Sequence, residues 1–224
     1  MELLLNGKSL GTASVSHLGY ASFNVSYAPG NLTAVARSAD GKTTVSHTRQ
    51  TPGAAASLAG TLDVPNIATG TGTAVVADGH DAALVRVTIL DTQNRRASAS
   101  NATVAFRVIS GPGHIVGVGN GDPMSHEANQ AAQHSAFHGY VHAVVRVTLD
   151  CTSNAREVDV ETAIVQRGAC PDPIGPIVVE ASAEGLGSTQ ISIPVSTDVE
   201  KDGVLAVAAG RPSPDALLAH FDSV

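Results

Sequence analysis

The sequence predicts an all-β protein made of two β-sandwich domains. Many short segments alternate apolar and polar residues, which is the pattern of strands with one buried face. Glycine, proline and asparagine turn signals separate these segments. No stretch sustains the 3.6-residue period of an amphipathic helix. Short strands at regular spacing, with such turns between them, are typical of sandwiches.

Residues 1–53 are interpreted as the first domain. The pairs Asn6-Gly7 and Asp40-Gly41 are strong signals for tight hairpin turns. Thr51-Pro52-Gly53 is interpreted as a linker, since proline cannot donate to a sheet ladder. The strands expected in this domain are 2–5, 10–15, 21–27, 32–37 and 43–48.

Residues 54–195 are interpreted as the second domain. In its clearest strand, Val85, Val87 and Ile89 share one face. Gly119 to Gln133 has no apolar period and is expected to be a long polar loop. The expected strands are 54–62, 84–90, 103–109, 115–118, 136–149, 177–183 and 190–195.

Residues 151–176 are expected to be an insertion at a loop tip. Without them, strands 141–149 and 177–183 would be joined directly as a hairpin. Cys151 and Cys170 would then lie near the base of the loop, either as a disulfide or as two free thiols. Residues 196–224 form an acidic tail, in which 213–219 has the N-cap and early proline of a short helix, either docked or frayed.

Composition excludes several classes of partner. The net charge is −7 without a basic run, so nucleic acid is not expected. No apolar window is long enough for a membrane helix. The absence of tryptophan disfavours a free-standing sugar-binding module. Low charge and abundant small polar residues favour a secreted, periplasmic or vesicular protein over a cytoplasmic one.

The histidines raise the question of a metal site. His134, His138 and His142 are four residues apart and would align on a helix, but the segment is strand-like. A partly solvated sheet face is therefore favoured over a metal site, and no cofactor is expected. His126-Glu127 begins like a zinc-protease motif, yet residue 130 is Gln rather than the second histidine.

Five segments resemble the C-terminal region of β-galactosidase-like proteins of glycoside hydrolase family 2. These are ELLLNGKSLG at 2–11, YAPGNLTAVA at 27–36, GPG at 111–113, VGVGNGDPMSHE at 116–127 and AFHG at 136–139. The resemblance covers residues 1 to about 194, apart from 151–176. It implies two immunoglobulin-like sandwiches, the first truncated because the family's domain begins some strands earlier. His138 stands where the family usually has Asn, and the tail has no counterpart.

The resemblance implies a non-catalytic accessory region. The family's two catalytic glutamates belong to an (α/β)8 barrel of about 250 residues, which this chain cannot contain. The expected partner is an upstream catalytic barrel in the parent chain. The region is expected to brace this barrel, to shape the rim of its substrate site, or to contribute to assembly, including homo-oligomerisation. An adhesin-like or carbohydrate-binding sandwich is the alternative.

The loop from Gly119 to Glu127 is expected to be structural rather than a barrel contact or a Ca²⁺ site. Asn120 and Asp122 can cap turns, and His126 and Glu127 can bridge the loop to the sheet. The residues concerned are Asn120, Gly121, Asp122, Pro123, Ser125, His126 and Glu127.

Overall fold

The computed structural model describes residues 1–151, 166–167, 170 and 173–197. The chain divides into two compact units, Met1–Gly53 and the residues from Ala54 onward, and each is described by itself. The tail helix expected at 213–219 and most of the 151–176 insertion lie outside the described residues. In the described part of the chain, no helix is long and apolar enough to cross a membrane.

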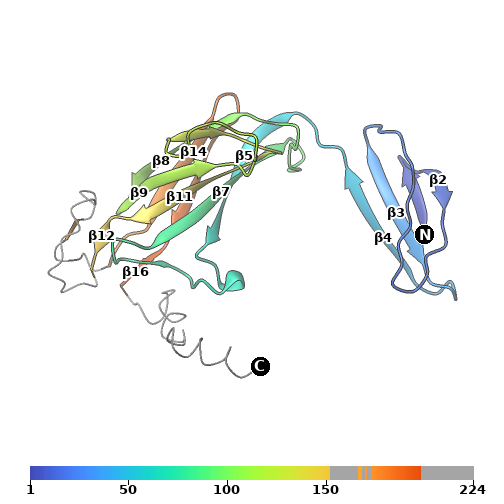
Figure 1. Ribbon diagram of the computed structural model, residues 1–224, viewed down its shortest axis with the longest axis horizontal. Helices are drawn as coiled ribbons and strands as arrows, with labels where there is room; N and C mark the ends of the chain where they lie inside the picture. Colours follow the sequence, from blue (N-terminus) through green and yellow to red (C-terminus); the bar gives the residue numbers. More distant parts are fainter. Residues whose placement is uncertain (152–165, 168–169, 171–172, 198–224) are drawn as a thin grey trace, which may run out of the picture. The chain divides into compact units, whose positions relative to one another are not determined.

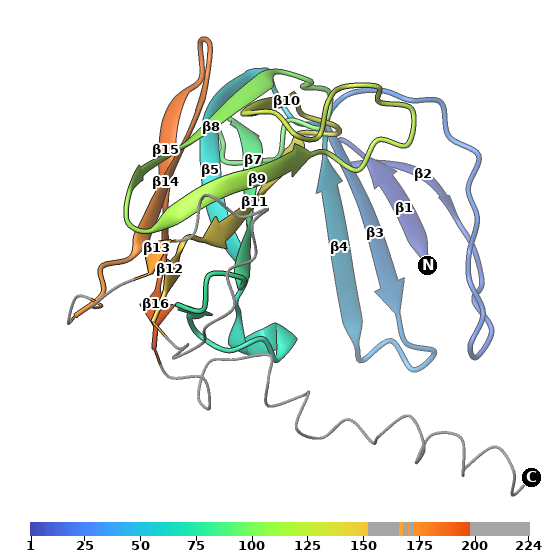
Figure 2. The same ribbon diagram turned by 60° about the vertical axis from the view of Figure 1, so that its left-hand side comes forward.

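The first unit is a single antiparallel sheet (Figure 2). Its strand order is β2-β1-β3-β4. Asn6 and Gly7 both have positive φ, 51° and 80°, which is the geometry of a type I′ hairpin turn between β1 and β2. The strands are β1 (Glu2–Leu5), β2 (Lys8–Thr12), β3 (Asn31–Arg37) and β4 (Thr44–Gln50).

The strand expected at 21–27 is wrong. This segment is irregular, and Tyr27 is 82% exposed. Its residues alternate, but no neighbouring strand of the unit pairs with them, and a strand requires a ladder partner. Alternation alone therefore could not decide the assignment.

The sheet of the first unit is amphipathic and has no core. Cross-strand register places Leu3, Leu5 and Val45 on the more apolar face, which also carries His47 and Arg49 on β4. The other face carries a 3.5 Å ion pair between Arg37 and Glu2. No residue of 1–53 is buried. The unit is thus one sheet whose apolar face has no second layer within 1–53.

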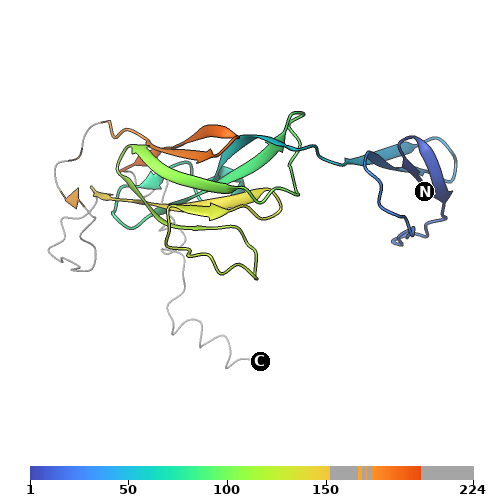
Figure 3. The ribbon, with the colours of Figure 1, turned by 90° about the horizontal axis from the view of Figure 1, so that it is seen from above.

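The second unit is a sandwich of two four-stranded sheets (Figures 1 and 3). The first sheet has the order β5-β7-β11-β9 and the second β10-β8-β14-β15. The strands of the first sheet are β5 (Ala55–Val64), β7 (Ala82–Asp91), β9 (Gly113–Gly119) and β11 (Tyr140–Val147). Those of the second are β8 (Thr103–Ser110), β10 (Gln133–Ser135), β14 (Ile177–Ala183) and β15 (Gly187–Ile193).

This order is that of an immunoglobulin-type sandwich. With β5, β7, β8, β9, β11, β14 and β15 lettered A to G, the sheets are A-B-E-D and C-F-G, with β10 added beside C. Two short parallel strand pairs and the 3₁₀ helix η1 (Ile67–Thr69) complete the described structure. The pairs are β12 (Leu149–Asp150) with β13 (Gln166–Arg167), and β6 (Val75–Val76) with β16 (Val195–Ser196).

The hairpin expected between strands 141–149 and 177–183 is wrong. β11 pairs with β7 and β9, whereas β14 pairs with β8 and β15 in the other sheet. The connection crosses from one layer of the sandwich to the other. Each strand alternates correctly, but the pattern does not say which sheet a strand joins.

The long strand expected at 136–149 is also divided. His138 and Gly139 have positive φ, 50° and 74°, and turn the chain tightly between Phe137 and Tyr140. A φ above zero suits Gly and Asn, which gives a physical reason for Asn at the His138 position in the resembling family.

The core of the second unit lies between its two sheets. Val85, Val87 and Ile89 of β7 share one face, as expected, and all three are fully buried. Val141, Ala143, Val145 and Val147 do the same on β11. Gly60 lies close under Ile191 of the opposite sheet, where an added Cβ would be 2.4 Å from Ile191 Cγ1. The described unit therefore has the dense interior of a complete sandwich.

Candidate functional site

The loop from Asn120 to Glu127 leaves β9 and leads toward β10 (Figure 2). Its turns are closed by side chains, as the Asx pattern predicts. Asn120 Oδ1 accepts from the Asp122 amide at 2.8 Å, and Asp122 Oδ1 accepts from the Met124 amide at 2.9 Å. Gly121 has a φ of 78°, which a side chain at this position would disfavour.

Ser135 of β10 holds both ends of the loop. Asn120 Nδ2 donates to the Ser135 carbonyl at 2.8 Å, and the Ser135 amide donates to Glu127 Oε2 at 2.9 Å. A serine in a short strand gives no sequence signal of this role, which belongs to its backbone. The loop is thus fastened to the sheet by one amide and one carboxylate.

Glu127 is an ionised hydrogen-bond acceptor. Its hydrogen bond from the Ser135 amide lowers the pKa of the carboxyl, with a smaller contribution from nearby His134. A glycosidase general acid needs the opposite, a carboxyl whose pKa is raised so that it holds a proton at neutral pH. The environment of Glu127 therefore suits fastening rather than proton donation.

Two hollows lie against this loop. One has a volume of about 370 Å³ and includes Glu127, His134 and His142 in its lining. The other has a volume of about 580 Å³ and includes His126 and Phe137. Asn120, Asp122, Ser125 and Glu127 line both, so the loop is the ridge between them.

The three candidate metal ligands occupy different environments. His134 is 1% exposed, and its Nδ1 lies 2.9 Å from the Ser135 carbonyl, so that nitrogen carries a proton and donates. His138 sits in the tight turn. His142 lies against Gly119, and burial followed by the nearby His134 lowers its pKa. Among the described residues, no three His, Cys, Asp or Glu side chains form a group that could hold a metal.

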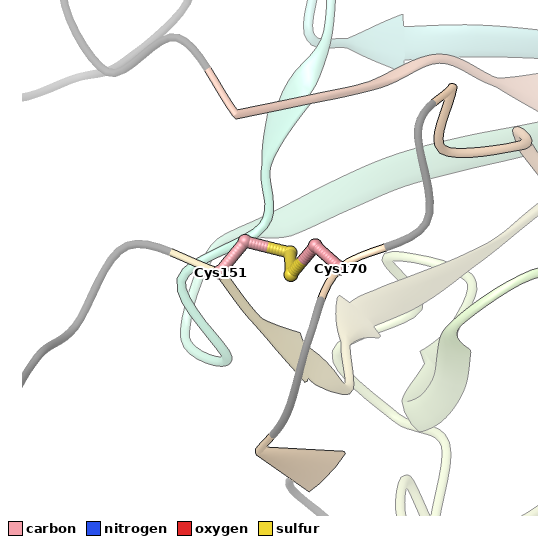
Figure 4. The surroundings of a disulfide bond; sticks show 2 residues. All are labelled: Cys151 and Cys170. Atoms are coloured by element: carbon pink, nitrogen blue, oxygen red, sulfur yellow. A yellow bond between two sulfur atoms is a disulfide. The ribbon is translucent and has the colours of Figure 1, made fainter.

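The two cysteines are joined as a disulfide (Figure 4). Their Cα atoms are 5.8 Å apart, and they are 19 residues apart in the sequence. The Cys151 amide donates to the Ala77 carbonyl at 2.7 Å. The disulfide therefore joins the two ends of the connection between Cys151 and Cys170 at a point next to the sandwich.

Other well-made polar contacts were not singled out by the sequence. Asp91 is 1% exposed and closes the turn after β7, accepting from the Gln93 and Arg95 amides through Oδ1. Its Oδ2 accepts from Arg95 Nε at 2.8 Å. The sequence signal that could have indicated this role is an aspartate at the end of a strand, directly before a polar loop.

Two family models match successive parts of the chain. Residues 68–167 match the glycoside hydrolase family 2 C-terminal domain 5, and residues 1–45 match a domain of unknown function, DUF4982. The first match runs into 151–176, a segment that the resemblance by motif left out.

Individual relatives are longer than this chain. Beta-galactosidase BoGH2A of Bacteroides ovatus is 30% identical over 148 residues, which is 65% of this chain and 16% of that protein. A solved glycosyl hydrolase family 2 member from Bacteroides cellulosilyticus is 27% identical, with a TM-score of 0.64 over 86% of this chain and 22% of its own. A β-glycosidase from Bacteroides vulgatus shares the fold, with 20% identity and a TM-score of 0.59 over 87% of this chain and 21% of its own.

Proposed function

We propose that this chain, which carries the C-terminal region of a glycoside hydrolase family 2 protein, is a non-catalytic accessory region of a β-galactosidase-like hydrolase. The observation that carries the proposal is the use of the signature loop. Its carboxylates accept backbone hydrogen bonds, and the environment of Glu127 stabilises the charged form. Such a loop fixes shape, and the reaction would belong to a catalytic barrel elsewhere in the parent protein.

The loop is proposed to brace that barrel and to shape the rim of its substrate site. Its ridge lies between two hollows, and Met124 at its tip is 76% exposed. A fastened loop with an exposed apolar tip is suited to packing against another protein surface. We also expect the parent protein to self-associate through the same region.

The test is an assay of the purified chain on an aryl β-galactoside. We expect no turnover above the buffer rate, with the Glu127→Gln variant indistinguishable from the parent sequence. Turnover that survives repurification and is lost in Glu127→Gln would overturn the proposal. In a longer protein that includes the barrel, Asn120→Ala should change KM or thermal stability by loosening the loop, with Asn24→Ala as the exposed control.

Sugar binding by the first unit is the second candidate function. Tyr20 and Tyr27 are 87% and 82% exposed, and tyrosine rings are platforms on which sugars stack. A glycan array probed with the chain and with a Tyr20→Ala, Tyr27→Ala double variant tests it. Saturable binding that the double variant loses supports a carbohydrate-binding module, whereas binding that it retains contradicts this candidate.

We also propose that the protein works outside the reducing cytoplasm. Structural disulfides persist in secreted, periplasmic and vesicular compartments, and Cys151 and Cys170 are paired. Maleimide labelling of freshly lysed source cells tests this, because both cysteines should react only after reduction. Labelling without reductant would contradict the proposed compartment.

A further inference from the structure

Arg146 is exceptional among the arginines of the second unit whose side chains the structure describes. Three others form ion pairs: Arg86 with Asp63, Arg95 with Asp91, and Arg107 with Glu180. Arg96 lies over the ring of Tyr140, 4.5 Å from its centroid. Arg146 instead faces His114 on β9 and Ala82 on β7 in the sheet register, so neither directly opposite residue is a carboxylate.

The guanidinium of Arg146 also contains a buried nitrogen with no partner. Its Nε is inaccessible to solvent and makes no hydrogen bond, and it is the only side-chain atom of that kind among the described residues. Buried polar groups in native proteins are almost always hydrogen-bonded, so an exception of this kind calls for an explanation.

Arg146 lines an open surface cavity of about 870 Å³. Strands β8, β9 and β11 and the segment 130–132 form its walls. The segment is held in place at both ends, because the Val118 amide donates to the Asn129 carbonyl at 2.8 Å and the Phe106 amide donates to the Ala132 carbonyl at 2.7 Å. The cavity is therefore bounded by fixed backbone on the side of the loop.

The lining suits an anion with a small apolar part. Val108, Ile115 and Val116 supply apolar wall, and His114 and Gln130 add polar groups beside Arg146. No carboxylate and no phenylalanine, tyrosine or tryptophan ring is among the described lining residues. A fixed positive charge without a counter-charge favours an anion, and the absence of such a ring disfavours a stacked sugar.

We infer that this cavity binds a carboxylate carried on a short apolar stem, with Arg146 as the anchoring residue. The planar guanidinium fork matches a carboxylate in a two-point contact, and a small rotation of the side chain would let Nε take part. The stem would lie against the apolar part of the lining. The inference is independent of the accessory role, because it concerns only the second unit's own cavity.

The first experiment titrates the chain with sodium butyrate, monitored by amide and methyl NMR shifts. We expect saturable changes at Gly113, Val116 and Ala131 with a millimolar dissociation constant. Butyramide, the uncharged analogue, should bind at least about tenfold more weakly because the charge-assisted bond is lost. Acetate should also bind about tenfold more weakly, since it lacks two methylene groups of apolar contact.

Variants identify the anchor. Arg146→Gln should abolish butyrate binding, and Arg146→Lys should weaken it severalfold, because a lysine keeps the charge but loses the fork. Arg107→Gln on neighbouring β8 is the control, since Arg107 is exposed, does not line the cavity and should leave binding unchanged. Should Arg146→Gln fail to fold, the Arg146→Lys titration decides the question.

Equal binding of butyrate and butyramide, or unaltered butyrate binding by Arg146→Lys together with Arg146→Gln, would overturn the inference. A carboxylate on a short apolar stem could belong to a protein side chain or to a free small acid, and N-acetyl-glutamate amide distinguishes these two sources. Tighter binding of this probe than of butyrate identifies a protein side chain as the natural occupant, whereas tighter binding of butyrate identifies a free small acid.

Discussion

The two units are built from the same kind of strand but differ in what covers them. In the second unit, β7 and β11 lie in one sheet and face β8 and β14 in the other, with residues such as Val87 and Val141 fully buried between the layers. In the first unit, one sheet stands without a second layer within 1–53, and Val45 on its apolar face is 61% exposed. Alternating sequence therefore makes a strand, but only a second layer makes a core.

Amide hydrogen exchange should show the largest difference between the units. Exchange in the centre of β7 requires opening of the sandwich, so we expect protection factors on the order of 10⁴ or more. In β1 and β3 of the first unit they should stay below about 100, because no buried side chain opposes opening. Comparable protection in β3 and β7 would show that the first unit is covered in solution, for instance by a second copy of the chain.

A large-to-small substitution should separate the units next. Ile177 of β14 is fully buried, and Ile177→Ala should lower the free energy of unfolding of the second unit by about 2–5 kcal/mol. Val45→Ala, a smaller truncation in the first unit, should alter the free energy of unfolding of that unit by no more than about 0.5 kcal/mol. Urea denaturation followed by far-UV circular dichroism measures both, and a Val45→Ala cost near that of Ile177→Ala would refute the comparison.

Reduction of the disulfide should weaken only the second unit. For a bridge between residues 19 apart, the chain-entropy model gives roughly 3 kcal/mol of stabilisation. Thermal unfolding with and without a reductant should therefore differ, as should that of the Cys151→Ala, Cys170→Ala double variant. Exchange rates in β1 and β3 serve as the internal control and should not change.

Two turn glycines sharpen the comparison further. Gly139 and Gly41 have similar φ angles, 74° and 71°, so alanine at either costs about 1 kcal/mol of backbone strain. At Gly139 the added Cβ would also lie 2.8 Å from the Ala97 carbonyl oxygen, whereas at Gly41 nothing lies within 4 Å. We expect Gly139→Ala to cost a further 1–2 kcal/mol or so in denaturation experiments. Equal costs would mean that the Gly139 turn moves freely.

The smallest expected effect is the pH dependence of Glu127. Its pKa is lowered in the folded state, so its stabilising contribution is complete above the unfolded value, about 4.3, and is lost as pH falls through the lower folded value. The side chain is 44% exposed, so solvent screens the effect. The stability difference between the parent sequence and Glu127→Gln should be small at pH 7 and vanish near pH 2. A difference that grows on acidification would contradict this assignment.

The sequence predicted strands well and their partners poorly. The alternation of Val85, Val87 and Ile89 predicted their shared buried face, because period-two patterning reports directly on side-chain direction. The same signal misled at 21–27, where no strand is available to pair. It also could not reveal that β11 and β14 belong to different sheets, since sheet membership depends on contacts distant in the sequence.

The candidate site shows the same division. Asn120 and Asp122 could be read as turn-closing residues because Asx turns are local. Ser135 could not, since its contribution is a backbone amide and carbonyl that meet the loop only after folding. Arg146 was not singled out either, because its lack of a partner depends on which residues lie beside it in the sheet.

The disulfide has a consequence for how this sandwich can change. Whatever sequence lies between Cys151 and Cys170 leaves and returns at points whose Cα atoms are 5.8 Å apart. A change in the length of that sequence should therefore leave the spacing between the two layers unchanged. The disulfide therefore makes this crossover a site that should tolerate insertions. A different loop or a small domain could replace the sequence between the cysteines while the two layers keep their register.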